Sequence, residues 1–154
     1  MTKLTALLDW YSQISPQTLP QLGQFYAADA RFKDPFNDVQ GVAAIEAIFS
    51  HMFATTDKPR FIIAERLEQG QQAFITWTFE FNLQGKPYQI IGGSHLVFNA
   101  NGDVTLHRDY WDAAEELLQK LPLIGAPIRW LRRRFKCQHS ARLSHYSNPQ
   151  DHAG

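Results

Sequence analysis

Four strand-like segments follow one another in the second half of the chain, at 61–67, 74–83, 88–98 and 104–111, with glycine-containing turns between them. Within 74–83, apolar side chains alternate with polar ones, which is typical of a strand with one buried face. Short turns that contain glycine join strands that run in opposite directions. The sequence therefore predicts a run of antiparallel hairpins, and this run limits the fold more than any other feature.

Helical patterns come before the hairpins. Apolar residues at helical spacing predict helices over 3–14 and 42–54, and Thr18 is placed to cap a short helix between them. A short strand is expected over 30–34, where Pro35 ends it. Helices followed by antiparallel strands predict a single α+β domain, in which helices cover one face of a curved sheet and leave an open mouth.

The last strand-like segment has unusual chemistry on one face. Side chains alternate along a strand, so His107, Asp109 and Trp111 share one face and Arg108 lies on the other. An imidazole, a carboxylate and an indole together are typical of the wall of a half-buried pocket. We expect His107 to shuttle a proton or to hold Asp109 ionised, and a structural ion pair is the alternative.

Ser94 and His95 are neighbours in the third segment and follow a pair of glycines at 92–93. Neighbouring side chains in a strand face opposite ways, so these two cannot form a nucleophile–base pair. A bulge at the glycines would exchange their faces, which leaves open which of them lines the pocket. No ligand spacing supports a metal site at His95, His107 and Asp109, and we expect neither a metal nor a cofactor.

The first half of the chain resembles the NTF2-like superfamily, and most closely its ketosteroid-isomerase and SnoaL-like polyketide-cyclase branch. The resemblance rests on the run Tyr-Ala-Ala-Asp-Ala-Arg-Phe-Lys-Asp-Pro-Phe at 26–36, followed by Gly41. The segment 93–98, the following Asn-Gly turn and the Tyr-Trp pair at 110–111 resemble later strands of the same fold. This likeness covers roughly residues 3–120 and implies a cone, in which a curved antiparallel sheet wraps around N-terminal helices and encloses a pocket. It does not fix the activity, because this superfamily contains enzymes, binders and scaffolds.

The resemblance also implies roles for single residues. Asp34 stands where ketosteroid isomerases keep the general base that moves a proton between carbon atoms. Asp109 stands where SnoaL-like cyclases place an acid/base aspartate, and Trp111 falls where the isomerases have a pocket-lining tryptophan. From its local sequence alone, Asp34 is equally well explained as a turn residue that accepts hydrogen bonds from nearby backbone N–H groups.

Two departures from the family pattern argue against particular activities. The isomerase oxyanion hole uses a tyrosine on the first helix and a protonated aspartate on the third long strand. Counting without gaps places these positions at Trp10, with Tyr11 beside it, and at Ser94, which argues against steroid isomerisation. Limonene-epoxide hydrolases share the fold but use an Asp-Arg-Asp arrangement, and Arg108 here faces away from Asp109.

Three functions remain open from the sequence. In the first, the protein is a cofactor-free acid/base catalyst for a small, mostly apolar carbonyl compound, an isomerase or cyclase. Asp34 would remove a proton, and Asp109 with His107 would return it or polarise the oxygen. Apolar walls would keep one carboxyl partly neutral, and the candidates for them are Phe32, Trp77, Phe79 and Trp111. The second function is a non-catalytic pocket for a hydrophobic ligand, and the third is an interaction module.

A homodimer is also expected, through an exposed face of the sheet. Apolar residues placed on that face would leave a large patch on a monomer, and such patches usually mark interfaces. The predicted patch consists of Ile75, Phe79, Phe81, Leu106 and Tyr110.

The formal net charge of zero hides an asymmetry between the body and the C-terminal segment. Residues 1–128 carry nine basic and fourteen acidic side chains, whereas residues 129–154 carry six and one. We therefore expect an NTF2-like domain over 1–120, a basic amphipathic extension over 121–138 and a disordered tail over 139–154. The basic segment 129–136 either docks on the acidic body or contacts an anionic membrane surface, and nucleic-acid binding is not expected.

The sequence predicts the cellular compartment only through the features that it lacks. No apolar run approaches the ~20 residues that a membrane span needs, and the N-terminus lacks the long apolar stretch of a signal peptide. The single cysteine, Cys137, cannot form an internal disulfide. These features predict a cytoplasmic protein.

Overall fold

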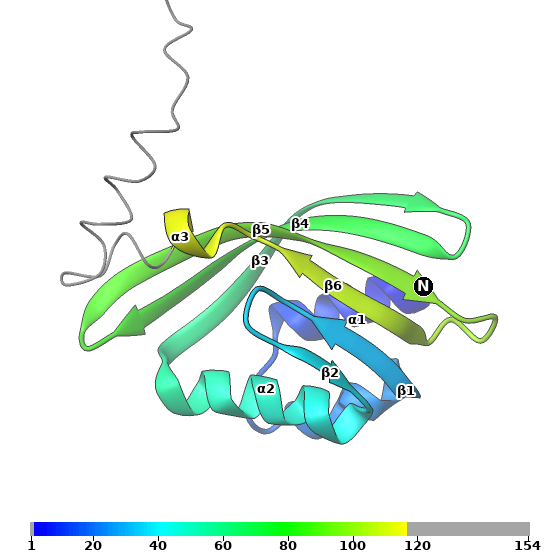
Figure 1. The fold of residues 1–154 in the computed structure, drawn as a ribbon, viewed down its shortest axis with the longest axis horizontal. Coiled ribbons are helices and arrows are strands. Elements are labelled where there is room, and N and C mark those ends of the chain that lie inside the picture. Colours follow the sequence, from blue (N-terminus) through cyan, green and yellow to red (C-terminus); the bar gives the residue numbers. More distant parts are fainter. Residues whose placement is uncertain (1, 117–154) are drawn as a thin grey trace, which may run out of the picture.

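The computed structural model describes residues 2–116, and most of them lie in one curved sheet and the helices packed against it (Figure 1). The prediction of an α+β domain is confirmed. The elements, in chain order, are α1 (Lys3–Ser12), the 3-10 helix η1 (Leu19–Gln24), β1 (Tyr26–Lys33), β2 (Asp38–Gln40), α2 (Val42–Thr55), β3 (Asp57–Gln69), β4 (Gln72–Leu83), β5 (Lys86–Phe98), β6 (Val104–Tyr110) and α3 (Ala113–Glu116).

The six strands are ordered β2-β1-β6-β5-β4-β3 across the sheet. The hairpins β3–β4–β5 and the return strand β6 are antiparallel, as the sequence predicts, and only β1 and β6 run parallel. In Figure 1 the long strands curve over α1, and α2 runs beneath the sheet. The sheet therefore has an inner face towards the helices and an outer face away from them.

Three strands begin or occur where the sequence pattern does not place them. β1 begins at Tyr26, inside the segment expected to be the second helix, because the chain there pairs with β6, and Val104 N donates to the carbonyl oxygen of Phe25 at 2.8 Å. β2 replaces a predicted turn, and Arg31 of β1 holds it through two hydrogen bonds to the Asp38 carboxylate. β3 starts at Asp57, where a loop is predicted. The pairing of β1 with β6 joins distant parts of the chain, which local patterns do not reveal, whereas β2 and β3 pair with strands that are next to them in the sequence.

The predicted outward patch is wrong for three of its five residues. Ile75, Phe79 and Phe81 are only 2%, 8% and 6% exposed, and they belong to the core on the inner face. Alternation correctly groups these side chains, but it does not say which face the helices cover. The outer face instead exposes a different set of large apolar residues: Ile62, Leu67, Phe74, Ile91 and Tyr110.

The two glycines of β5 lie against aromatic rings on opposite faces of the sheet. A Cβ added to Gly92 would lie 2.6 Å from the Trp77 ring, and one added to Gly93 would lie 2.7 Å from the Phe74 ring. Trp77 is buried in the core, whereas Phe74 is exposed on the outer face, where its ring can turn into solvent. The same added methyl group should therefore lower the free energy of unfolding more at Gly92 than at Gly93.

We expect Gly92→Ala to lower the free energy of unfolding by about 1–3 kcal/mol, the usual cost of overpacking a core. Gly93→Ala should lower it by less than about 1 kcal/mol, as most surface changes do. Urea denaturation of both variants measures the difference, and each substitution acts as the control for the other because both sites lie in one strand. An equal loss of unfolding free energy in the two variants would show that the Trp77 ring moves as easily as the Phe74 ring.

Candidate active site

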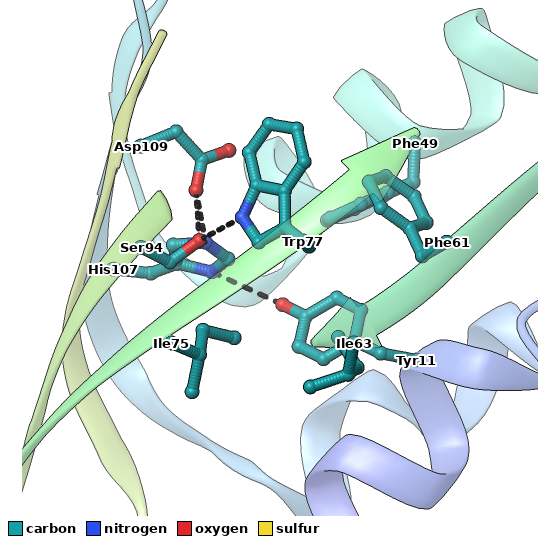
Figure 2. Close-up of a pocket in the computed structure, with 9 residues that line it drawn as sticks. All are labelled: Tyr11, Phe49, Phe61, Ile63, Ile75, Trp77, Ser94, His107 and Asp109. Atoms are coloured by element: carbon teal, nitrogen blue, oxygen red, sulfur yellow. Dashed lines mark hydrogen bonds and ion pairs between the residues drawn. The ribbon is translucent and has the colours of Figure 1, made fainter. Parts of the chain in front are cut away.

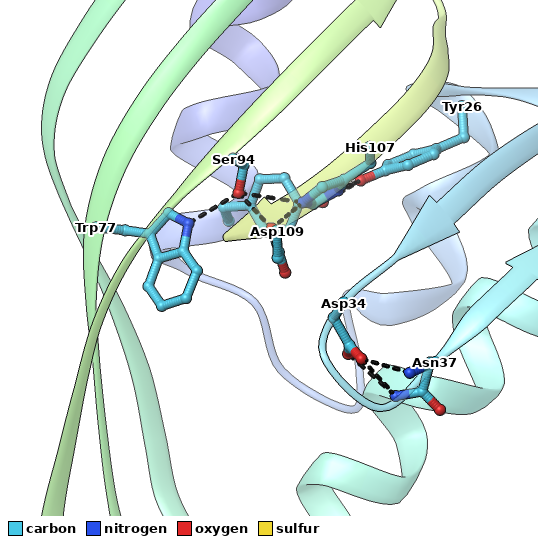
Figure 3. Close-up of polar contacts among 8 residues, drawn as sticks. Tyr26, Asp34, Asn37, Trp77, Ser94, His107 and Asp109 are labelled. Atoms are coloured by element: carbon cyan, nitrogen blue, oxygen red, sulfur yellow. Dashed lines mark hydrogen bonds and ion pairs between the residues drawn. The ribbon is translucent and has the colours of Figure 1, made fainter. Parts of the chain in front are cut away.

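Strand β6 presents His107 and Asp109 side by side on the inner face, as the alternation predicts. The His107 ring is buried, and its Nε2 lies 2.7 Å from Oδ1 of Asp109 (Figure 3). Phe32 of β1 packs its ring edge-on against the imidazole, with the ring centroids 4.8 Å apart. The polar pair is therefore enclosed by apolar side chains, and its hydrogen bonds are shielded from water.

The register between β4 and β5 decides which of Ser94 and His95 faces inward. The pairing runs without a bulge past the two glycines, so Ser94 points inward and is 2% exposed. Its hydroxyl donates to Oδ1 of Asp109 at 2.5 Å and accepts from Nε1 of Trp77 at 2.8 Å. His95 lies on the outer face, where its Nε2 is 2.8 Å from Oε1 of Gln72, so of the two neighbours it is Ser94 that faces the inner side.

Two buried tyrosines complete the polar cluster at the other side of the imidazole. The hydroxyls of Tyr11 and Tyr26 lie 3.0 and 2.6 Å from Nδ1 of His107, and they also contact each other. Burial raises the pKa of both tyrosines well above the usual value, so both hydroxyls keep their protons. Tyr26 was not singled out as a site residue, although it opens the motif at 26–36, because its segment was interpreted as the end of a helix.

Trp10 is not part of this cluster. Its indole Nε1 donates to the carbonyl oxygen of Thr18 at 3.0 Å, and its ring packs on Phe25. Successive residues of an α-helix project about 100° apart, so Tyr11 points towards the inner sheet face while Trp10 points towards η1. Trp10, where ungapped counting places the isomerase tyrosine, therefore lines neither of these two cavities.

One cavity of ≈ 330 Å³ brings several predicted residues together. Asp34, Asp109 and Trp111 all line it, as does Phe32. Among residues 2–116 no lysine or arginine lines it. The apolar part of the remaining wall is aromatic and aliphatic: Phe36, Phe49, Phe61, Trp77, Phe79, Phe81, Ile48, Met52, Leu83 and Ile90. A smaller inner cavity of ≈ 20 Å³ lies beside Tyr11, Ser94, His107 and Asp109 (Figure 2). The site thus consists of a largely apolar chamber, whose polar lining residues are Asp34, Asn37, His51, Thr55, Thr56 and Asp109, and a small cavity beside the polar cluster.

The two carboxylates of the chamber are held differently. Asp34 accepts hydrogen bonds from the backbone N–H groups of Phe36 and Asn37, each at 2.7 Å, and both its oxygens accept from the Asn37 side chain (Figure 3). This is the turn-capping arrangement that its sequence context also predicts. In Asp109, the bonds from Ser94 and His107 reach Oδ1, and within the described residues none reaches Oδ2. Asp109 is therefore the carboxylate with an oxygen left for a ligand.

Two further properties apply to residues 2–116 alone. In this range no three or more His, Cys, Asp or Glu side chains converge as a metal ion would require. No helix in the same range combines the length and hydropathy needed to cross a membrane. The predicted extension over 121–138, with the basic segment 129–136, and the predicted disordered tail lie outside the described residues.

The chain belongs to the family of SnoaL-like domains, whose model matches residues 7–107. No curated protein matches it by sequence. Among solved structures, one similar protein is from Catenulispora acidiphila; it has a ketosteroid isomerase-like fold and was solved in complex with trimethylamine. It is 19% identical to this chain, with a TM-score of 0.66, and the match covers 79% of this chain and 96% of that one. An NTF2-like protein of unknown function from Exiguobacterium has 16% identity and a TM-score of 0.63, with 72% and 98% covered. A Mycobacterium tuberculosis epoxide hydrolase has 15% identity and a TM-score of 0.60, with 74% and 83% covered. These likenesses establish the NTF2-like cone.

Proposed function

We propose that this protein is a cofactor-free acid/base catalyst that moves a proton on a small, mostly apolar carbonyl compound, with Asp109 as the base. One observation carries the proposal: Asp109 is anchored through Oδ1 by Ser94 and His107, while Oδ2 is left for a ligand in an aromatic chamber. A positioned carboxylate in apolar surroundings is suited to exchange protons with a carbon acid.

In the proposed step the carbonyl compound lies in the chamber with the carbon next to its carbonyl facing Oδ2 of Asp109. The C–H bond breaks, its proton goes to Asp109, and its electron pair moves towards the carbonyl oxygen. Asp109 then returns the proton to another carbon, which isomerises the compound, or to the same carbon, which regenerates the compound or inverts that carbon. Asp34 is assigned no proton transfer, because its own turn uses both of its oxygens.

A non-catalytic pocket for a hydrophobic ligand is the alternative, and the mostly apolar lining favours it equally. The names of the similar structures do not decide between them, because they include an epoxide hydrolase and a protein bound to trimethylamine. Both functions require that an apolar ligand enters the same chamber, but only catalysis requires proton exchange. Binding and exchange must therefore be measured separately.

The tryptophans provide a test of binding with a control inside the molecule. Trp77 and Trp111 line the chamber, whereas Trp10 is buried away from it. On adding 2-tetralone, a small aromatic ketone, we expect the indole N–H signals of Trp77 and Trp111 to shift in ¹H–¹⁵N NMR spectra of the full chain, and that of Trp10 to stay. If saturating ketone leaves the indole N–H signals of Trp77 and Trp111 unshifted, that result would contradict both functions.

We also propose that the protein forms a homodimer through the outer face of the sheet. The sequence argument named an apolar patch, and the exposed apolar residues of that face now define it as Ile62, Leu67, Phe74, Ile91 and Tyr110. Ile62 and Ile91 both lie opposite Thr78 in neighbouring strands, so they belong to one row across the sheet. Apolar surface of this kind is stabilised when a second copy covers it.

A further inference from the structure

Tyr26 lies behind the site, where no substrate in the described cavities would touch it. It is 3% exposed and lines neither the chamber nor the small inner cavity. Its ring stacks near the His107 ring, with the centroids 6.1 Å apart, and its hydroxyl lies 2.6 Å from Nδ1 (Figure 3). Any effect of Tyr26 on the chemistry must therefore pass through the two side chains that its hydroxyl contacts, His107 and Tyr11.

The contacts at the far side of the imidazole determine where its proton lies. Nε2 of His107 is 2.7 Å from Oδ1 of Asp109, and an ionised carboxylate only accepts hydrogen bonds. Nε2 must therefore carry a hydrogen. In the neutral ring Nδ1 is then an acceptor, and the Tyr26 hydroxyl is its closest donor.

The hydroxyl protons of the two tyrosines decide between a neutral and a charged ring. If Nδ1 accepts from Tyr26, then Tyr11 can donate to the Tyr26 oxygen, and every proton in the cluster has an acceptor. If Nδ1 were protonated, it would donate to a tyrosine oxygen, and one hydroxyl proton would lose its acceptor among the described residues. Leaving a buried donor without a partner costs free energy, so the cluster favours the neutral ring.

We propose that Tyr26 is a positioning residue that holds His107 in the neutral tautomer with its hydrogen on Nε2, facing Asp109. A neutral donor supports the Asp109 carboxylate without turning the pair into an imidazolium–carboxylate ion pair, which would weaken Asp109 as a base. The titratable groups in contact with the imidazole are Tyr11 from α1, Tyr26 from β1 and Asp109 from β6 itself. The consequence for catalysis rests on the proposed function, but the tautomer does not.

The test is ¹H–¹⁵N NMR of the imidazole rings in the full-length protein, without ligand, across a pH titration. His107 is assigned by comparison with His107→Gln. We expect the wild type to show the Nε2–H tautomer. In Tyr26→Phe the shorter of the two hydroxyl contacts to Nδ1 is lost and only Tyr11, at 3.0 Å, is left to donate to the neutral ring. The imidazolium should therefore form at a higher pH, by up to about one unit, which is the worth of one such bond. Tyr88→Phe removes a hydroxyl outside both cavities and should leave His107 unchanged.

The outcome that overturns the proposal is a Tyr26→Phe protein whose His107 has the tautomer and titration of the wild type. If Tyr26→Phe does not fold, 3-fluorotyrosine at position 26 keeps the ring and makes its hydroxyl a stronger donor. The Nδ1 resonance of His107 should then shift, and an unchanged resonance would equally overturn the proposal. Because this readout needs no substrate, it separates failure of the tautomer assignment from failure of the proposed catalysis.

Discussion

Replacing Asp109 by asparagine is expected to slow proton exchange on a bound ketone by roughly 10²–10⁴-fold, the usual contribution of a general base. Asparagine keeps the shape of the side chain and an oxygen that can accept from Ser94 and His107, but its amide cannot take up the proton. The measurement is the rate at which 2-tetralone exchanges its α-hydrogens for deuterium in D₂O, followed by ¹H NMR at saturating ketone.

Asp34→Asn is the matched control for this experiment. Its carboxylate lines the same chamber but accepts hydrogen bonds from its own turn, so the exchange rate should fall less than about tenfold, below the range expected of a general base. The turn itself should weaken, which thermal unfolding will show. A larger rate loss in Asp34→Asn than in Asp109→Asn would return the role of base to Asp34, as the resemblance to ketosteroid isomerases implies.

The Ile91→Glu substitution is expected to convert a dimer into a monomer. Ile91 is 59% exposed on the outer face, in the same row as Ile62. A carboxylate buried in an apolar interface without a partner is strongly unfavourable, so association should weaken by a hundredfold or more, in the range seen for interface hot spots. Sedimentation at micromolar concentration measures the change.

Gln71→Glu provides the control for charge. Gln71 lies in the exposed turn between β3 and β4, and the substitution adds the same negative charge away from the outer face. This variant should sediment as the wild type does. A wild type that sediments as a monomer of 17.7 kDa would contradict the dimer proposal directly.

The sequence predicts the parts of this fold that local periodicity controls. The hairpins from β3 to β6 and helices α1 and α2 follow from apolar spacing and glycine turns, although their ends differ by a few residues. The start of β1 depends on pairing with β6, a distant segment, whereas β2 pairs with the neighbouring strand β1. A three-residue strand such as Asp38–Gln40 has no periodicity of its own, so only the tertiary structure reveals it.

The candidate site, too, can be predicted from the sequence only in part. Alternation along β6 correctly places His107 and Asp109 on one face, and the wall shared by Asp34, Asp109 and Trp111 agrees with the family resemblance. Alternation does not reveal the bulge-free register that turns His95 outward. It also does not show which side of a sheet the helices cover, so Ile75, Phe79 and Phe81 were placed on the wrong face. Tyr26 reaches His107 only through the parallel pairing of β1 with β6.

The most direct test of the central claim is whether the wild-type protein itself catalyses carbon–hydrogen exchange. In D₂O, 2-tetralone should exchange its α-hydrogens faster with the protein than in matched buffer, and the acceleration should saturate as the ketone fills the chamber. Binding that shifts the Trp77 and Trp111 signals without any acceleration over buffer would contradict catalysis. That result would leave the chamber as a binding pocket for apolar ligands.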